Sequence, residues 1–205
     1  MDYHNQTIEG FKIKDPKMKK IYKEIEKFAK VGFNCILYGP SGSGKEFLAK
    51  HYHKFFKKYH ANQRDMFDVN CQNLYKLAAQ SELFGHVKGA FTDAHSNRDG
   101  LFKTAKDGVI FLDEIGELSA EMQNMLLRAI DPGKAKLLGS DETYNTNNVS
   151  IIGATDKDPN KLNAQLLYRM GQTLVVPGLD DRKADIPGAI DYFIHNMFRD
   201  RIKIA

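Results

Sequence analysis

A glycine-rich stretch at residues 37–50, LYGPSGSGKEFLAK, constrains the fold more than any other part of the chain. The motif G-x-x-x-x-G-K runs from Gly39 to Lys45, between a short apolar run at 34–38 and a segment with helical spacing at 45–59. Glycines let backbone amides curl around phosphate oxygens, and the N-terminus of a helix adds the positive end of a dipole. Between a strand and a helix, this pattern predicts a phosphate-binding loop rather than an ordinary turn.

The motif and its flanking residue supply the candidate nucleotide-binding residues. Lys45 would place a point charge on the β- and γ-phosphates. Glu46 is the local departure, because the motif puts a Ser or Thr hydroxyl there to hold magnesium. The full set of candidates is Gly39, Pro40, Ser41, Gly42, Ser43, Gly44, Lys45 and Glu46.

Strand-like and helical segments alternate along the chain. Apolar runs predict strands at 34–38, 67–70, 108–114, 149–155 and 173–177, and helical spacing predicts helices at 16–32, 45–59, 73–83, 118–130 and 184–199. Asp15 before Pro16, and Ser119 near the start of the fourth helix, are residue types that begin helices. The alternation indicates an α/β fold in which helices cover both faces of a parallel sheet.

The apolar run IFLDE at 110–114 ends in two acids. A magnesium-dependent phosphohydrolase needs such acids on the strand beside its phosphate loop. We expect Asp113 to orient magnesium or its waters, and Glu114 to polarise the attacking water as general base. An acidic helix cap is the alternative for this segment alone, but the upstream phosphate loop favours the catalytic interpretation.

The length, charge and composition of the chain bear on four other possibilities: a membrane protein, a secreted protein, a nucleic-acid-binding protein and a metal site. The chain has 205 residues, enough for one well-cored domain, and no apolar run reaches the about 18 residues that a membrane span needs. The first residues lack the apolar core of a signal peptide, so we expect a cytoplasmic protein. The net charge of +4 comes from scattered lysines and indicates nucleic-acid binding only weakly. We expect Cys35 and Cys71 to be reduced and buried, and the spacing of His51 and His53 matches no metal site.

Three long segments resemble one protein family. They are SELFGHVKGAFTDA (81–94), LFKTAKDGVIFLDEIGELSAEMQNMLLRAI (101–130), and LLYRM with PGLDDRKADIP (166–187). From about Ile8 to Phe198 the chain resembles the AAA+ domain of bacterial enhancer-binding proteins, the activators of sigma-54 RNA polymerase. The resemblance implies a P-loop NTPase, with an AAA+ parallel sheet sandwiched by helices at 1–183 and only the start of a helical lid at 184–205. It also makes Glu46 a family trait.

The resemblance assigns further roles in nucleotide turnover. Asn70 matches the Asn that restrains the catalytic Glu until the ring is engaged. Arg169 in LLYRM matches one of two arginine fingers that reach a neighbouring subunit's nucleotide, where the guanidinium would neutralise charge on the transferred phosphoryl group. The implied cofactors are ATP and Mg²⁺, with Asp113 at the metal, and the implied assembly is a homo-oligomer, a hexameric ring.

The stretch GAFTDA at 89–94 would be the loop that contacts the sigma-54 RNA polymerase holoenzyme, through Phe91 and Thr92. In the family it reads GAFTGA, so Asp93 replaces a glycine. A positive φ at this position would disfavour Asp, and the added charge would lie at the contact tip. DNA would be bound only through a domain absent from these residues.

Two more departures concern hydrolysis. Asn163 stands at the first arginine-finger position, and Asp156 replaces the sensor Asn that ends ATN in the family. We expect slow hydrolysis of ATP with nucleotide binding retained, because the phosphate loop is intact. The departures also support an alternative, a degenerate nucleotide-binding scaffold or regulatory subunit without sigma-54 activation. A general AAA+ remodeller or helicase loader would leave GAFTDA unexplained.

Overall fold

A five-stranded parallel sheet forms the centre of the molecule. The computed structural model describes residues 7–8, 11–61, 65–73 and 76–202. Across the sheet the strands are β11 (Gln172–Val175), β3 (Cys35–Tyr38), β10 (Ser150–Thr155), β7 (Val109–Asp113) and β4 (Phe67–Asn70). Every pair is parallel, so each connection must cross a face of the sheet, and the helices make those crossings. The predicted α/β fold is confirmed.

Alternate strand residues point into two separate cores, one on each face of the sheet. Leu37 packs with α1 (Pro16–Val31) and α2 (Lys45–His60). Ile36, its neighbour on β3, packs on the other face with residues of α3 (Lys76–Phe84), α4 (Leu101–Thr104), α5 (Ala120–Ile130) and α6 (Ala164–Arg169). Because strands buried on both faces read as continuous apolar runs, the sequence reveals them clearly.

Two predicted helix starts are confirmed by their cap geometry. The Asp15 carboxylate accepts a hydrogen bond from the Met18 amide at 2.9 Å, and α1 ends at Gly32 in the left-handed region with φ of 70°. The Ser119 hydroxyl accepts from the Met122 amide at 3.3 Å at the start of α5. The side-chain acceptors therefore set where both helices begin.

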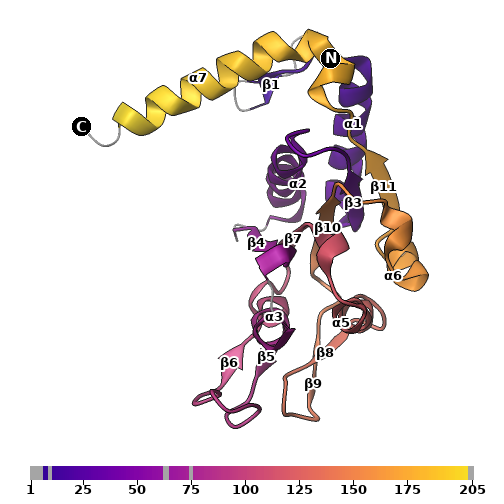
Figure 1. Ribbon diagram of the computed structural model, residues 1–205, viewed down its shortest axis with the longest axis vertical. Coiled ribbons are helices and arrows are strands. Elements are labelled where there is room, and N and C mark those ends of the chain that lie inside the picture. Colours follow the sequence, from indigo (N-terminus) through magenta and orange to yellow (C-terminus); the bar gives the residue numbers. More distant parts are fainter. Residues whose placement is uncertain (1–6, 9–10, 62–64, 74–75, 203–205) are drawn as a thin grey trace.

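Two short hairpins extend from one end of the molecule, at the bottom of Figure 1. One pairs β5 (Gly85–His86) with β6 (Arg98–Asp99), and the other pairs β8 (Lys134–Lys136) with β9 (Thr143–Asn145). The sequence analysis did not predict them, nor the pair β1 (Thr7–Ile8) and β2 (Phe11–Lys12), nor α4 and α6. Strands of two or three residues leave too little periodicity to recognise.

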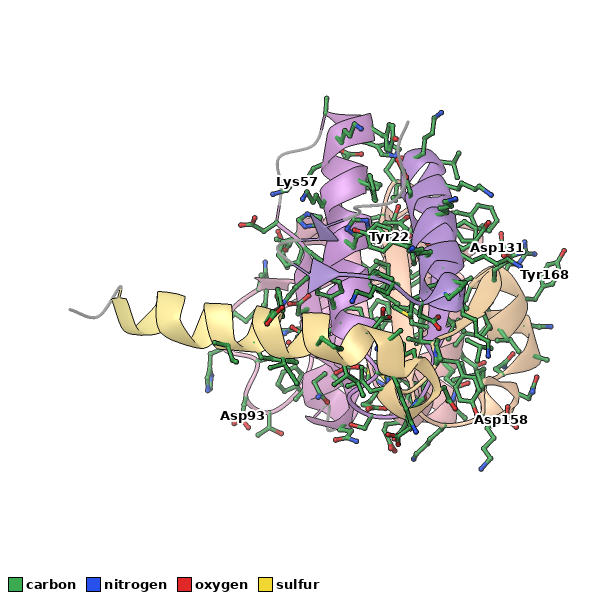
Figure 2. All side chains as sticks on the ribbon, turned by 90° about the horizontal axis from the view of Figure 1, so that it is seen from above. Tyr22, Lys57, Asp93, Asp131, Asp158 and Tyr168 are labelled. Atoms are coloured by element: carbon green, nitrogen blue, oxygen red, sulfur yellow. The ribbon has the colours of Figure 1, made fainter. Side chains whose placement is uncertain are left out.

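The opposite end carries α7 (Ile186–Ile202), which follows the 3₁₀ segment η5 (Leu179–Asp185). In Figure 2 this helix runs outward from the rest of the molecule. Its apolar residues Ile190, Phe193 and Ile194 are exposed, whereas Ala189 packs into the α1–α2 core. The remaining 3₁₀ turns are η2 (Cys71–Asn73), η3 (Ile115–Glu117) and η4 (Pro159–Lys161).

Both cysteines are free and buried, as expected. Burial raises the pKa of each thiol, Cys35 and Cys71, to about 12, so neither is a ready thiolate. Among the described helices, none combines the length and the apolar character needed to cross a bilayer.

Candidate nucleotide site

The loop from Gly39 to Gly44 connects β3 to α2 and is fixed by backbone contacts. The Gly39 amide donates to the Thr155 carbonyl at 3.1 Å, and a Cβ on Gly39 would lie 2.3 Å from the Val176 carbonyl oxygen. Gly42 and Gly44 have φ of 73° and 88°, in the left-handed region that favours glycine. The strand ends on either side thus hold the loop in one curled shape.

Lys45 lies inside this curl. It is 7% exposed, and its Nζ donates to the Gly39 carbonyl at 2.8 Å and the Pro40 carbonyl at 3.2 Å. The Ser43 Oγ is buried and has no hydrogen-bond partner. A cation held only by carbonyls, beside an unpaired hydroxyl at a helix N-terminus, fits the oxygens of a phosphate chain.

Arg182 and Asp185 of η5 support the loop from the far side, and the sequence analysis assigned them no role. Arg182, 5% exposed, donates from Nη2 to the Ser43 carbonyl at 2.6 Å and from Nη1 to Asp185 at 3.4 Å. Asp185 is fully buried and also accepts from the Lys14 and Asp15 amides at 2.6 and 2.9 Å. One ion pair therefore joins the loop, η5 and the start of α1.

An apolar pocket of about 90 Å³ opens beside the loop. Met18, Phe47, Leu179 and Tyr192 contribute apolar or aromatic walls, and the backbone of Gly42 to Gly44 forms the side nearest the phosphates. An apolar slot next to a phosphate-binding turn suits a nucleotide base.

Glu46 does not enter this curl. Its side chain is 63% exposed and accepts from Lys50 Nζ at 2.6 Å, one turn along α2. Such a pair stabilises a helix by roughly 0.3–0.5 kcal/mol. The departure from the hydroxyl at this position is therefore accommodated on the helix surface.

Asp113 and Glu114 lie where β7 ends, on the edge of the sheet that also carries the phosphate loop. The Asp113 carboxylate accepts from the Glu114 amide at 3.1 Å, and Glu114 has a φ of 52°, which is uncommon outside glycine. The Glu114 Oε2 is buried without a hydrogen-bond partner. A strained backbone and an unpaired carboxylate oxygen are typical of a reactive position.

The expected placement of these acids needs one correction. The sequence analysis put IFLDE on the strand beside the loop, but β10 lies between β3 and β7. Asp156, which follows β10, therefore lies between the phosphate loop after β3 and the two acids at the end of β7. Desolvation, then the charges of Asp156 and Asp113, raise the pKa of Glu114, while the charge of Lys45 and a hydrogen bond from the Asp156 backbone lower it. Asp156 consequently acts on the candidate base directly.

No described group of three or more His, Cys, Asp or Glu side chains could enclose a metal ion by itself. Magnesium in nucleotide sites is commonly held by one or two carboxylates together with substrate phosphates. Asp113, beside Glu114 and at the same edge of the sheet as the phosphate loop, fits that smaller contribution.

Asn70 ends β4 directly opposite Asp113 of β7, so the sheet brings it to the same edge as the acids. Its Oδ1 accepts from the Gln72 amide at 2.9 Å, which makes it part of the turn into η2. The Asn70 residue is exposed, and its side-chain bond is local rather than to Glu114.

Arg169 lies apart from the phosphate loop, at the end of α6. It pairs with Asp131 at 2.6 Å, both about half exposed, and its guanidinium lies 5.7 Å from the Tyr168 ring. Figure 2 shows Asp131 and Tyr168 together on one flank of the molecule. The structure does not bring Arg169 to the phosphate loop of its own chain.

Asn163 has a structural task in the described chain. Its Oδ1 accepts from the amides of Gln165 at 2.8 Å and Leu166 at 3.4 Å, so it is the N-cap of α6. The Asn163 backbone amide donates to the Oε1 of Gln123 in α5 at 2.7 Å. The residue at the expected first finger position therefore fixes the helix that carries Arg169.

The GAFTDA loop forms the tip of the β5–β6 hairpin. Phe91 is partly buried, with its ring edge-on to His86 at 4.9 Å, whereas Thr92 and Asp93 are exposed. The Gly89 amide donates to the Ala94 carbonyl at 2.9 Å and closes the loop. Asp93 does not have a positive φ, so the backbone strain expected from the lost glycine is absent at this residue.

Comparison with known proteins adds a family match. Residues 11–174 match the model of the sigma-54 interaction domain. The chain is 38% identical over 191 residues to the transcriptional regulatory protein RtcR of Escherichia coli K12, covering 89% of this chain and 36% of that protein. It is 36% identical over 191 residues to the Nif-specific regulatory protein of Azotobacter vinelandii, covering 90% and 36%. The chain thus spans about a third of the length of these relatives.

Solved structures share the fold. NtrX from Brucella abortus in complex with ATP superposes with a TM-score of 0.73 at 25% identity, covering 89% of this chain and 42% of that one. A cryo-EM reconstruction of Hsp104 with ATPγS and casein has a TM-score of 0.59 at 18% identity, covering 78% and 33%. The second likeness concerns the arrangement of strands and helices alone.

Proposed function

The chain belongs to the family of sigma-54 interaction domains, and we propose that it is the ATP-hydrolysing module with which a bacterial regulator remodels sigma-54 RNA polymerase. One observation carries the proposal. The curled loop with Lys45, the acids Asp113 and Glu114, and Asn70 all come to the same edge of one parallel sheet. Ligands of open α/β sheets bind at this carboxyl edge.

The proposed chemistry divides among residues of this chain. The backbone from Gly39 to Glu46 binds the phosphates of ATP, with Lys45 exchanging its carbonyl partners for phosphate oxygens and the Glu46 side chain staying on the surface of α2. Glu114 takes a proton from the attacking water at its unpaired Oε2. Magnesium, held by Asp113 when bound, would neutralise charge on the phosphate oxygens. Asn70 restrains Glu114 by hydrogen bonding until the assembly is engaged.

In a ring of copies, each chain receives an arginine finger from its neighbour. The described contacts of Arg169 are with Asp131 and Tyr168 rather than with its own phosphate loop, so we assign it to a neighbour's nucleotide in a hexamer. With Asn163 occupied as a helix cap and Asp156 adding negative charge beside Glu114, turnover is slow. Losing one arginine finger costs roughly 10³ or more in rate in related chemistry.

The output is mechanical. Phe91 and Thr92 at the hairpin tip contact the sigma factor in the holoenzyme, and the energy of hydrolysis moves that tip. DNA is bound through a separate domain of the longer protein, and the module works in the cytoplasm. We place the boundary between the ATPase domain (1–183) and the lid (184–205) inside η5, just before α7 begins at Ile186.

One observation favours the second candidate, a nucleotide-binding scaffold without sigma-54 activation. Asn163 caps α6 and bonds to α5, so it stabilises the fold at the position where the family would carry an arginine finger. In that case ATP binding would persist while hydrolysis and sigma-factor contact would be lost.

Turnover of ATP measured against protein concentration separates the two. Fingers acting in trans require assembly, so specific turnover should rise steeply with concentration and Arg169→Ala should remove the rise. Glu114→Gln is the chemical control, and we expect it to lower turnover by roughly 10² to 10⁴ while ATP still binds. Turnover that is absent at every concentration, in a protein that binds ATP, would favour the scaffold.

A further inference from the structure

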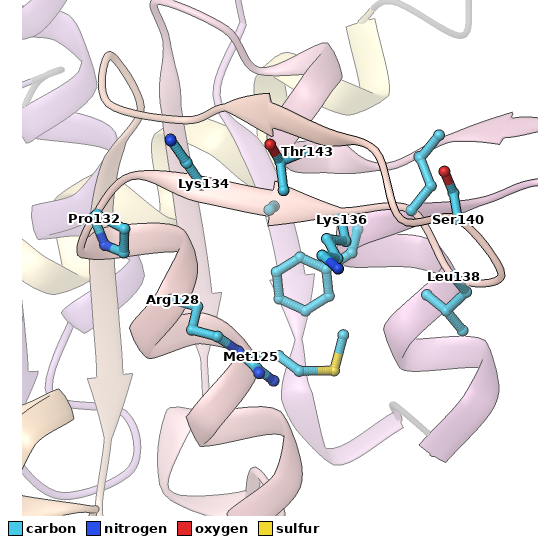
Figure 3. A pocket seen from close by; sticks show the side chains of 11 residues that line it. Met125, Arg128, Pro132, Lys134, Lys136, Leu138, Ser140 and Thr143 are labelled. Carbon is cyan, nitrogen blue, oxygen red and sulfur yellow. The ribbon is translucent and has the colours of Figure 1, made fainter.

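A pocket of about 380 Å³ lies between α5 and the β8–β9 hairpin, far from the phosphate loop (Figure 3). Its floor is apolar, with Phe84 and Ala135 almost fully buried. Met125, Leu137 and Leu138 form half-buried walls. A volume of this size lies in the range of ligand-binding pockets and is also enough for a few side chains of a protein partner.

The rim of the pocket is positively charged. The eleven lining residues, all within the described chain, include Arg128, Lys134 and Lys136 and no acid. Lys136 pairs with Asp141 at 3.3 Å on the hairpin, and Arg128 and Lys134 are both exposed. Cations around an apolar floor complement a segment that carries carboxylates next to an apolar side chain.

The pocket wall is joined to the strand that leads into the GAFTDA loop. The Leu138 amide donates to the Gly85 carbonyl at 2.9 Å, and the Val87 amide donates to the Leu138 carbonyl at 3.0 Å. A Cβ on Gly139 would lie 2.8 Å from the Ala90 side chain, so the two hairpins touch at their tips. A partner bound in the pocket would therefore lie beside the GAFTDA loop and contact the hairpin residues that support this loop.

We propose that this pocket is a second docking site for the sigma factor, taking an acidic segment that bears an apolar side chain. The inference rests on the proposed function of the GAFTDA loop. The apolar lining argues against nucleic acid, whose phosphates would meet the cations but would gain nothing from the half-buried Met125, Leu137 and Leu138. Because the walls belong to α5 and a paired hairpin, the pocket exists before the partner arrives.

The test measures binding of purified sigma-54 to the assembled protein in the presence of ADP and aluminium fluoride. Reversing two rim charges with Arg128→Glu and Lys134→Glu should weaken binding at least about tenfold, because like charges would then face the acidic segment. The matched control reverses two exposed lysines outside the pocket, Lys106→Glu and Lys161→Glu, and should stay within about twofold. Unfolding temperatures and ATP affinity check that each variant is folded.

Each outcome has a distinct meaning. If the pocket and control variants lose equal affinity for sigma-54, the loss comes from the change in net charge and the proposal is overturned. Full binding by the pocket variant, with Phe91→Ala still abolishing it, would overturn the pocket and leave the loop in place. No binding by the assembled native protein would overturn both. Loss of duplex DNA binding by the pocket variant, with sigma-54 binding unchanged, would assign the cations to nucleic acid instead.

Discussion

The phosphate loop and the GAFTDA loop are both turns that contain glycine, yet different forces hold them. A Cβ on Gly39 would strike the Val176 carbonyl oxygen at 2.3 Å, whereas a Cβ on Gly89 would meet nothing within 4 Å. The first turn is fixed by strands on either side, the second by a few local hydrogen bonds and by Phe91 against His86. A substitution at Gly39 therefore damages the fold, while one in the second loop, such as Asp93, changes what the surface can bind.

The largest expected effect is at the phosphate loop. Lys45→Ala removes a buried cation that no neighbour replaces, and ATP affinity measured by calorimetry should fall by roughly thirtyfold or more. Lys50→Ala, which removes only an exposed pair with Glu46, is the matched control and should bind ATP like the native protein. Unchanged affinity in Lys45→Ala would place the phosphates elsewhere.

Two alanine substitutions compare the turns directly. Gly39→Ala should lower the free energy of unfolding by about 3 kcal/mol, because its Cβ overlaps backbone that cannot withdraw. Gly89→Ala should cost only about 1 kcal/mol, the strain of a left-handed φ of 82° in open space. Urea denaturation measures both, and equal losses would contradict the distinction between packed and local turns.

Asp93→Gly tests the second loop for recognition. Because Asp93 has an ordinary backbone conformation, stability should change by less than about 0.5 kcal/mol. Binding of sigma-54 to the assembled protein with ADP and aluminium fluoride should strengthen about tenfold as a charge leaves the tip. Adding Phe91→Ala should abolish the gain. If affinity stays the same while Phe91→Ala has no effect, the loop has another partner.

The smallest effect concerns the pH dependence of turnover. Desolvation, followed by the charge of Asp156, raises the pKa of Glu114, so the base stays protonated to higher pH than an ordinary Glu. Asp156→Asn removes one of those contributions, lowers this pKa and should move the acid limb of the kcat profile to lower pH. Asp158→Asn, two residues on and exposed, should leave the limb in place. If Asp156→Asn leaves the pH of the acid limb unchanged, Glu114 is not the titrating base.

Sequence predicted the sheet well because its strands are buried on both faces. The runs that became β3, β7 and β10 are nearly uninterrupted in apolar residues, and Asp15 and Ser119 marked helix starts by a local bond that needs no tertiary context. The strand order was not predictable, because it depends on which crossings the helices make. That order placed β10, and with it Asp156, between the phosphate loop and the candidate acids.

Other features depended on distant partners. The buried pair of Arg182 and Asp185 looks like an ordinary charged turn in DDRKADIP, since nothing local reveals that Ser43 and Lys14 provide their partners. The strain expected at Asp93 was wrong because the family's glycine was taken to require a positive φ, which this loop does not adopt there. The roles assigned to the phosphate loop, to Asp113 and Glu114, and to Asn70, Arg169, Phe91 and Thr92 all stay predictions.

The buried carboxylate of Asp185 has a consequence for synthesis on the ribosome. It accepts from the amides of Lys14 and Asp15, which lie 171 and 170 residues earlier, and its partner Arg182 holds Ser43 from 139 residues away. Closing contacts of such sequence separation is slow. The residues of the phosphate loop are therefore synthesised early, but the residues that hold the loop in place emerge late. On the proposed function, ATP would stabilise the completed site, so its contribution to folding would come only after η5 has emerged.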